Sequence, residues 1–180
     1  HPGLAERIGK VAINLSGDVL ADPDFPAWVE ALLLKYPVSV GKVGFEVTES
    51  QQILDWDAAR QLLQQLRKLG FSISLDDFGT GLATFDYLTS FPFDVIKIDG
   101  RFVRDIDTDP VNQAIVAAIT AVARTLGLKT VAEYVENAEI ARQVADLGVD
   151  YLQGYGVGRP TPLAEVSQRL SGAPEMALSS

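Results

Sequence analysis

Polar side chains that can bind metal ions recur in this sequence directly after short apolar runs, the places where strands end. The residues that close the six runs are Asn14, Glu46, Asp76-Asp77, Lys97 with Asp99, Glu133 and Gln153. Carboxylate and amide oxygens are preferred ligands of hard divalent cations such as Mg²⁺ and Mn²⁺. Because parallel strands present their C-terminal ends at one edge of a sheet, these residues are expected to meet there. The pattern predicts metal-assisted chemistry on a phosphate ester.

The composition narrows the kind of site. The 180 residues include no cysteine and a single histidine, His1, so a metal ion must be held by oxygen ligands. The net charge of -9 argues against binding of a nucleic-acid polymer. No apolar run approaches the roughly 20 residues that span a bilayer, and no signal peptide is visible. A cytoplasmic location is expected, either free or as the cytoplasmic domain of a membrane-anchored sensor.

The alternation of apolar runs and amphipathic stretches predicts an α/β fold with a parallel sheet. The expected strands cover residues 11–16, 43–49, 71–76, 94–99, 129–135 and 150–155. The expected helices cover residues 22–36, 57–69, 82–88, 110–126 and 137–147, with a short one from 161. In the first helix, the residues at core-facing spacing are Phe25, Trp28, Val29, Leu32 and Leu33.

Side-chain alternation predicts which strand residues line the site. In the strand at 71–76, the bulky apolar residues share one face, and Ser72, Ser74 and Asp76 share the other. The same parity in every strand directs the polar residues named above to one site at the C-terminal ends of the strands. Asp77 and Glu49 are expected at the rim of this site. Carboxylates so close raise each other's pKa, and two divalent ions would relieve the repulsion. Taken singly, each residue is better explained as a helix cap or a solvated loop charge, but this explanation is much weaker for six strand ends with the same parity.

Lys97 has two interpretations, because a cation among inward carboxylates needs a reason. It is either a structural counter-ion or a group that orients a nucleophilic water and offsets developing phosphate charge. The second is slightly favoured.

These motifs, in this order, closely resemble the EAL-domain family of cyclic di-GMP phosphodiesterases. The matching segments are Asn14-Leu15-Ser16, Glu46-Val47-Thr48-Glu49, Asp76-Asp77-Phe78-Gly79-Thr80-Gly81, Lys97-Ile98-Asp99 with Phe102-Val103, Val131-Ala132-Glu133 with Val135-Glu136, and Gln153-Gly154-Tyr155 with Pro160. The resemblance covers nearly the whole chain. It implies a TIM-like (β/α) barrel that hydrolyses cyclic di-GMP to linear pGpG with two Mg²⁺ or Mn²⁺ ions.

The resemblance also implies roles for individual residues. The metal ligands would be Asn14, Glu46, Asp76, Asp77 and Glu133. Lys97 and Glu133 would be catalytic, with Lys97 positioning the attacking water, and Glu49 would support the 77–81 loop near a dimer contact. Residues of the substrate site would be Gln153, Glu136 and Asp99. The expected partners are cyclic di-GMP, a second copy in a homodimer, and upstream GGDEF or PAS-type signalling domains.

Three departures from the family pattern stand out. The Glu-Ala-Leu signature belongs upstream of Asn14, whereas Glu30-Ala31-Leu32 lies downstream in a helix, where Glu30 is expected to be solvated. Tyr134 replaces a usual glycine and is expected to point outward and pack under a helix. Leu82-Ala83-Thr84 replaces a tyrosine and two serines, which changes loop hydrogen bonds without removing a metal ligand.

The chain therefore reads as an incomplete EAL barrel with about six of eight strands. Residues 1–172 would be the C-terminal three-quarters of the domain, and residues 173–180 a loose tail. The full-length parent is expected to be the phosphodiesterase, and this fragment alone to have little or no activity. Two alternatives remain open: a catalytically inactive cyclic di-GMP receptor, and an unrelated divalent-metal barrel acting on a sugar phosphate.

Overall fold

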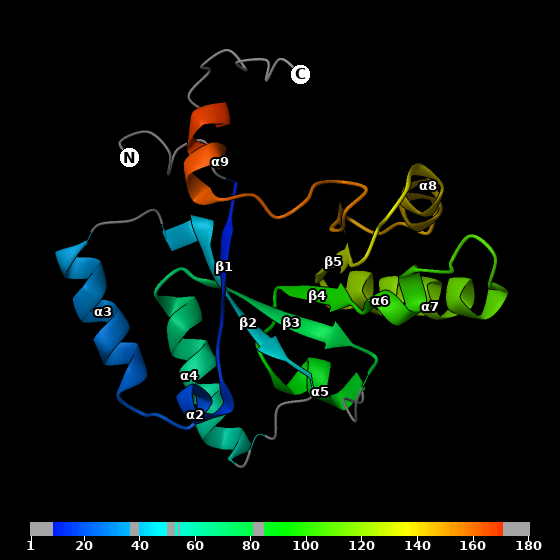
Figure 1. Cartoon of the computed structure of the whole chain (residues 1–180). Helices are drawn as coiled ribbons and strands as arrows, with labels where there is room; N and C mark the ends of the chain where they lie inside the picture. The colour runs from blue at the N-terminus through cyan, green and yellow to red at the C-terminus, as the bar shows by residue number, and fades with distance from the viewer. Residues whose placement is uncertain (1–8, 37–39, 50–52, 54, 81–84, 171–180) are drawn as a thin grey trace.

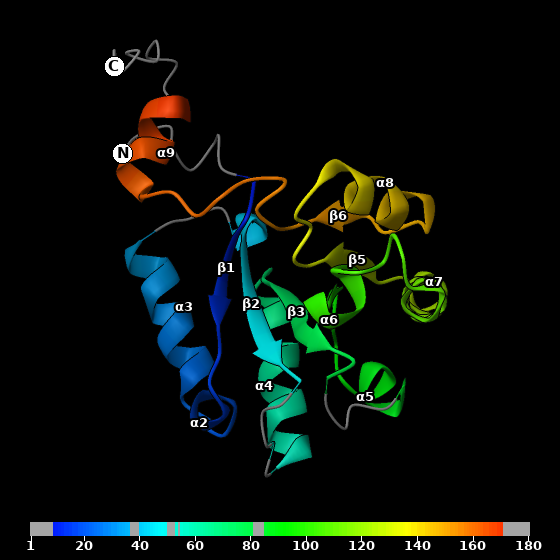
Figure 2. The same cartoon turned by 45° about the vertical axis from the view of Figure 1, so that its right-hand side comes forward.

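A computed structural model of the chain describes residues 9–36, 40–49, 53, 55–80 and 85–170. Six parallel strands form one sheet in the order β1-β2-β3-β4-β5-β6. They are β1 (Val11–Asn14), β2 (Val43–Thr48), β3 (Ser72–Phe78), β4 (Val95–Ile98), β5 (Lys129–Ala132) and β6 (Tyr151–Leu152). The sheet curls into part of a barrel with helices around its outer side (Figures 1 and 2). The predicted incomplete TIM-like fold is confirmed.

The helices follow the strands in the predicted alternation. They are α2 (Gly17–Leu20), α3 (Phe25–Lys35), η1 (Val40–Lys42), α4 (Trp56–Lys68), α5 (Phe85–Ser90), α6 (Gly100–Val103), α7 (Pro110–Leu126), α8 (Ala138–Asp146) and α9 (Leu163–Leu170). The helix predicted for residues 110–126 matches α7. Asp109 caps this helix by accepting a hydrogen bond from the Val111 N–H, and Gly127 ends it in a left-handed conformation.

The core lies between the sheet and its outer helices. Leu63 and Leu66 of α4 pack in one buried cluster with Ile73, Leu75 and Ile96 of the sheet. Each of these side chains is fully buried, and burying one stabilises the fold by about 1.5–3 kcal/mol. The apolar parity predicted for β3 is therefore confirmed. The alternate positions of β3 carry polar side chains, which face the inside of the curved sheet.

The edges of the sheet differ from the sequence expectations. All four residues of β1 are exposed, and Trp28 of α3, predicted to face the core, is 57% exposed. That prediction was wrong, because α3 lies at one outer side of the molecule beside α4 (Figure 1), and the buried residues of this helix are Pro26 and Val29. β5 and β6 end earlier than predicted, since Tyr134 and Gly154 have positive φ angles that turn the chain out of the sheet.

Some expectations fall outside the described residues, namely the Leu82-Ala83-Thr84 variation and the tail at 173–180. The domain boundary at residue 172 stays a prediction. Within the described ranges, none of the helices combines the length and apolarity needed to cross a bilayer.

Candidate active site

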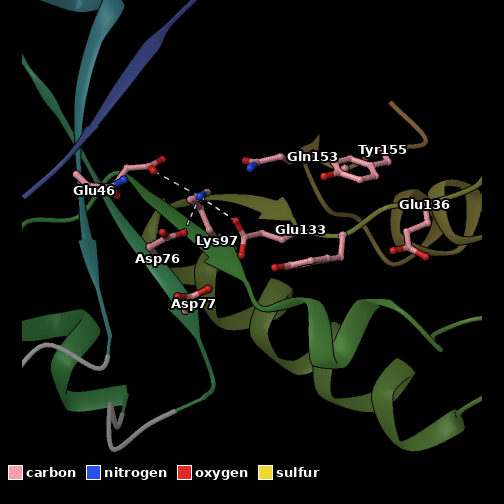
Figure 3. Close-up of a pocket in the computed structure, with 11 residues that line it drawn as sticks. Glu46, Asp76, Asp77, Lys97, Glu133, Glu136, Gln153 and Tyr155 are labelled. Carbon is pink, nitrogen blue, oxygen red and sulfur yellow. Dashed lines mark hydrogen bonds and ion pairs between the residues drawn. The ribbon is translucent and has the colours of Figure 1, made fainter. Parts of the chain in front are cut away.

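A pocket of about 520 Å³ opens at the C-terminal ends of the strands. Figure 3 shows its acidic side chains gathered around Lys97 from β2, β3 and the end of β5. Gln153, Tyr155 and Glu136 form the opposite wall. The predicted site residues that line it are Asn14, Glu46, Asp76, Asp77, Lys97, Glu133, Glu136 and Gln153. Strand parity predicted six of these eight residues; Asp77 was expected at the rim, and Glu136 was implied by the resemblance to the EAL family.

Lys97 is the centre of this arrangement. Its Nζ lies 2.6 Å from Asp76 Oδ1, 2.8 Å from Glu133 Oε1 and 3.5 Å from Glu46 Oε2. The Lys97 side chain is only 8% exposed. Burial lowers the pKa of Lys97, but hydrogen bonds to Asp76 and Glu133 outweigh it and raise the pKa above 10.5. The Lys97 ammonium therefore balances part of the negative charge of the carboxylates around it.

Asp76 and Asp77 both reach the pocket although they are adjacent in β3. Strict alternation would send them to opposite faces. The β3–β4 register shifts between Leu75 and Phe78, and Asp77 takes φ 56°. This bulge turns Asp77 back toward the side that carries Asp76. Burial, followed by the charges of Asp76 and Asp99, raises the pKa of Asp77.

The carboxylates have the chemistry of a divalent-cation site. One oxygen from each of Asp76, Asp77 and Glu133 lies within 4.8 Å of the others. Burial raises the pKa of Glu133, Lys97 opposes this, and Asp76 and Asp77 add to it. Three convergent hard oxygen donors without histidine or cysteine suit Mg²⁺ or Mn²⁺. The residues present thus fit the predicted metal ions.

At the rim of the pocket, the Glu49 side chain binds backbone N–H groups of the loop that follows β3. Its Oε2 accepts hydrogen bonds from the Gly79 N–H at 2.7 Å and the Thr80 N–H at 2.8 Å. This pair of bonds ties the end of β2 to the turn that follows Asp77. The position agrees with the predicted loop-supporting role, which stays a prediction.

Asp99 has a different setting from the one predicted. Its Oδ1 accepts hydrogen bonds from the Arg101 N–H at 2.8 Å and from Arg101 Nε at 3.2 Å, so it caps α6. Asp99 interacts with Asp77 but does not line the pocket. Its predicted contact with substrate has no geometric support here, because the cap holds the carboxylate at the helix end.

Comparison with known proteins decides the family. A sequence profile described as EAL domain matches residues 3–160. The chain belongs to the EAL domain family. The cyclic di-GMP phosphodiesterase PdeF of Escherichia coli strain K12 is 42% identical over 168 residues, which are 93% of this chain and 22% of PdeF. The chain spans about a fifth of the length of the curated relatives it matches.

Solved EAL structures have the same fold. The PaMucR phosphodiesterase in complex with c-di-GMP superposes with a TM-score of 0.80 at 36% identity, over 91% of this chain and 69% of that one. Klebsiella pneumoniae BlrP1, solved with manganese and cyclic di-GMP, gives a TM-score of 0.79 at 36% identity, over 87% of this chain and 40% of BlrP1. BlrP1 was also solved with calcium and cyclic di-GMP.

Two departures from the EAL pattern can now be located. Glu30 is exposed on α3 and is not among the pocket residues, as expected for a solvated helix position. Tyr134 lines the pocket and is 47% exposed, so the expectation that it points outward was wrong, although its ring does pack against Gly100 of α6. The alternation argument failed because β5 ends at Ala132 and Tyr134 adopts φ 55°.

Sequence reasoning also assigned no role to Tyr155, which lines the pocket of this EAL chain. The signal was present, since Tyr155 has the same parity as Gln153 two residues earlier. Gly154 between them has φ 156° and lies against the Val135 backbone, where a Cβ would collide. A glycine is therefore required at this close approach of two chain segments.

Proposed function

We propose that this chain carries the catalytic residues of a cyclic di-GMP phosphodiesterase. The enzyme would hydrolyse the cyclic dinucleotide to linear pGpG. The observation that carries the proposal is the contact of the Lys97 ammonium with Glu46, Asp76 and Glu133 in the pocket. The EAL family membership and the cyclic di-GMP complexes of PaMucR and BlrP1 support the choice of substrate.

Each residue has a role that its setting supports. Asn14, Glu46, Asp76, Asp77 and Glu133 would hold two Mg²⁺ or Mn²⁺ ions. Such ions polarise a phosphoryl oxygen and lower the pKa of a bound water. Lys97 keeps its proton, orients the attacking water by donating from Nζ, and offsets the charge that develops on the phosphate. Gln153 and Glu136 would contact substrate from the opposite wall.

The reaction adds one water across one phosphodiester bond. The water oxygen bonds to phosphorus, and the P–O3′ bond breaks. The 3′ oxygen takes a proton, which leaves a 5′-phosphate on the linear dinucleotide. Glu133 lies 2.8 Å from the Lys97 Nζ, so it is placed to accept the proton of the water that Lys97 orients.

The parent protein and the isolated chain would behave differently. We propose that the parent carries further barrel strands and upstream signalling domains of the GGDEF or PAS type, and acts as a homodimer in the cytoplasm. Residues 1–180 alone would show little turnover, because the glutamate of the Glu-Ala-Leu signature is expected from a strand before β1. Glu30 cannot replace it from the exposed side of α3.

A product assay tests this proposal. The parent protein and residues 1–180 are incubated with cyclic di-GMP and Mn²⁺, with and without EDTA, and pGpG is measured by chromatography. We expect metal-dependent conversion by the parent and at least a thousandfold loss with Glu133→Gln. The control Glu139→Gln changes an exposed glutamate on α8 that pairs with Arg142. Binding by the parent without cleavage would instead identify a receptor.

A further inference from the structure

Two tyrosines lie on the pocket wall, and a guanidinium packs against each ring. Arg104 Cζ is 4.1 Å from the centre of the Tyr134 ring, and Arg159 Cζ is 5.0 Å from the centre of the Tyr155 ring. Both tyrosines line the pocket, and their exposed fractions are 47% and 62%. A cation against one ring face fixes the ring and leaves other parts of it accessible.

Tyr134 is held more firmly than an ordinary surface side chain. Its φ of 55° lies in the left-handed region, which tyrosine rarely adopts. The next residue is tied to β6, because the Val135 N–H donates to the Gln153 carbonyl at 3.0 Å. The ring also fits against Gly100, where an added Cβ would lie 2.5 Å from Tyr134 Cγ. Backbone, cation and close packing thus fix the ring direction together.

The place of this ring suits a nucleobase. Tyr134 directly follows Glu133, which contacts Lys97 at 2.8 Å, so the ring stands beside the proposed phosphate site. Flat aromatic side chains beside a phosphate site bind bases by stacking, and an arginine on the other face strengthens the stack. The pocket wall around Lys97 is acidic. It would therefore bind the phosphate group of a ligand through bound cations rather than contact a base.

We propose that Tyr134, braced by Arg104, stacks on one guanine base of cyclic di-GMP and raises the affinity of this chain for it. The inference rests on the proposed function, because it takes cyclic di-GMP as the ligand. The resemblance to the EAL family implies a glycine at position 134, so the contact would be an addition of this chain. Tyr134 would select ligands with a base beside the reacting phosphate.

Calorimetric titration tests the proposal. The 180-residue chain is titrated with cyclic di-GMP in Ca²⁺, a cation with which BlrP1 was solved in complex with cyclic di-GMP. We expect Tyr134→Gly to weaken binding about 5- to 30-fold and Tyr134→Phe to stay within about twofold of the original chain. Tyr134→Gly should fold, because glycine adopts φ 55° without strain. The matched control is Tyr36→Ala, an exposed tyrosine with Lys35 over its ring.

A second readout reports stacking directly. A cyclic dinucleotide with 2-aminopurine in place of one guanine should lose fluorescence on binding the original chain, and keep most of it on Tyr134→Gly. Equal affinity and equal quenching in both would overturn the proposal while leaving the phosphodiesterase function intact. A Tyr134→Phe chain as weak as Tyr134→Gly would also overturn it, because the hydroxyl would then carry the contact. No saturable binding by the original chain would overturn this inference, whereas the phosphodiesterase function is decided separately by the product assay on the parent protein.

Discussion

The charge balance of the pocket depends on one ammonium group. Lys97 is buried and contacts three carboxylates, so its removal would take away the positive neighbour that Glu46, Asp76 and Glu133 share. Breaking a buried ion pair by removing one partner costs several kcal/mol, because the other charge stays buried and unpaired. An exposed pair with the same geometry costs far less, since water replaces the lost partner.

We expect Lys97→Met to lower the free energy of unfolding by about 3 kcal/mol in EDTA. Urea denaturation followed by circular dichroism measures this loss. The matched control is Lys129→Met, because Lys129 Nζ also lies 2.6 Å from a carboxylate oxygen but its side chain is 59% exposed. That control should change stability much less. Equal losses in the two variants would contradict the view that burial makes the Lys97 contacts important.

Mn²⁺ should recover part of the loss in Lys97→Met, since cations can neutralise the same carboxylates. The unfolding midpoint of this variant should therefore rise more with added Mn²⁺ than that of the original chain. An equal rise in both would argue that Lys97 and the ions do not share these ligands.

Single residues also show where strand alternation succeeds and where it fails. Parity placed Lys97 and Asp76 correctly, because Lys97 lies in regular β4 and Asp76 keeps its register opposite Thr48 of β2 before the bulge at Asp77. It could not describe Asp77 and Tyr134, since both have left-handed backbones that reverse the side-chain direction. Neither residue is a glycine, the usual sign of such a conformation in a sequence.

At the level of elements, the same kind of aspartate contact links neighbouring strands at the end of the sheet opposite the pocket. Asp94, just before β4, accepts the Ile73 N–H of β3 at 2.9 Å and pairs with Arg67. Asp150, just before β6, accepts the Thr130 N–H of β5 at 2.9 Å and pairs with Lys129. Each aspartate ties the beginning of one strand to the strand before it. These bonds help fix the register that brings the carboxylates together at the far end.

The Asp150 connection should make stability depend on pH. Burial raises the pKa of Asp150, but hydrogen bonds from Lys129 and Thr130 outweigh it and lower the pKa below 3.8. The native state therefore prefers the ionised form, so its stabilising contribution is complete above pH 3.8. That contribution is lost as the pH falls through the lowered native pKa.

Asp150→Asn should thus destabilise the chain at pH 7 and make a smaller difference at about pH 2.5. Urea unfolding at the two pH values measures both differences. A loss of the same size at both would show that the charge of Asp150 contributes nothing and that only its shape and hydrogen bonds matter.

Elements with strong boundary signals could be predicted closely, and short ones could not. The Asp109-Pro110 start and the Gly127 stop fixed α7 at both ends. α2 and α6 have four residues each, too few for a 3.6-residue period to appear, and both were missed. The strand predicted at 150–155 is longer than β6, which has two residues. Gly154 turns the chain out of the sheet where the residue pattern still predicts a strand.

For the whole molecule, the unequal burial of the strands should appear as unequal stability. Ile73 and Leu75 of β3 and Ile96 of β4 are fully buried, whereas Val11 and Ile13 of β1 are 45% and 46% exposed. Local opening needs less free energy where fewer apolar contacts are lost. The edge strands should therefore open more easily than the centre of the sheet.

Hydrogen–deuterium exchange with peptide-level mass spectrometry tests this gradient. We expect the amides of β3 and β4 to exchange only by global unfolding, and those of β1 to exchange at least tenfold faster. Peptides from α4 provide the internal reference, because Leu63 and Leu66 belong to the same core. Uniform exchange across β1 to β4 would mean that the edge is as cooperative as the centre.

The lysine in the middle of the acidic pocket also bears on the order of assembly inside a cell. A cluster of carboxylates without any internal cation would have to be relieved by protonation or by bound ions as the chain folds. Here a built-in ammonium already takes part of that load. On the proposed function, the divalent ions would then bind to a site whose carboxylates are already held in place, so ion binding would follow folding rather than drive it.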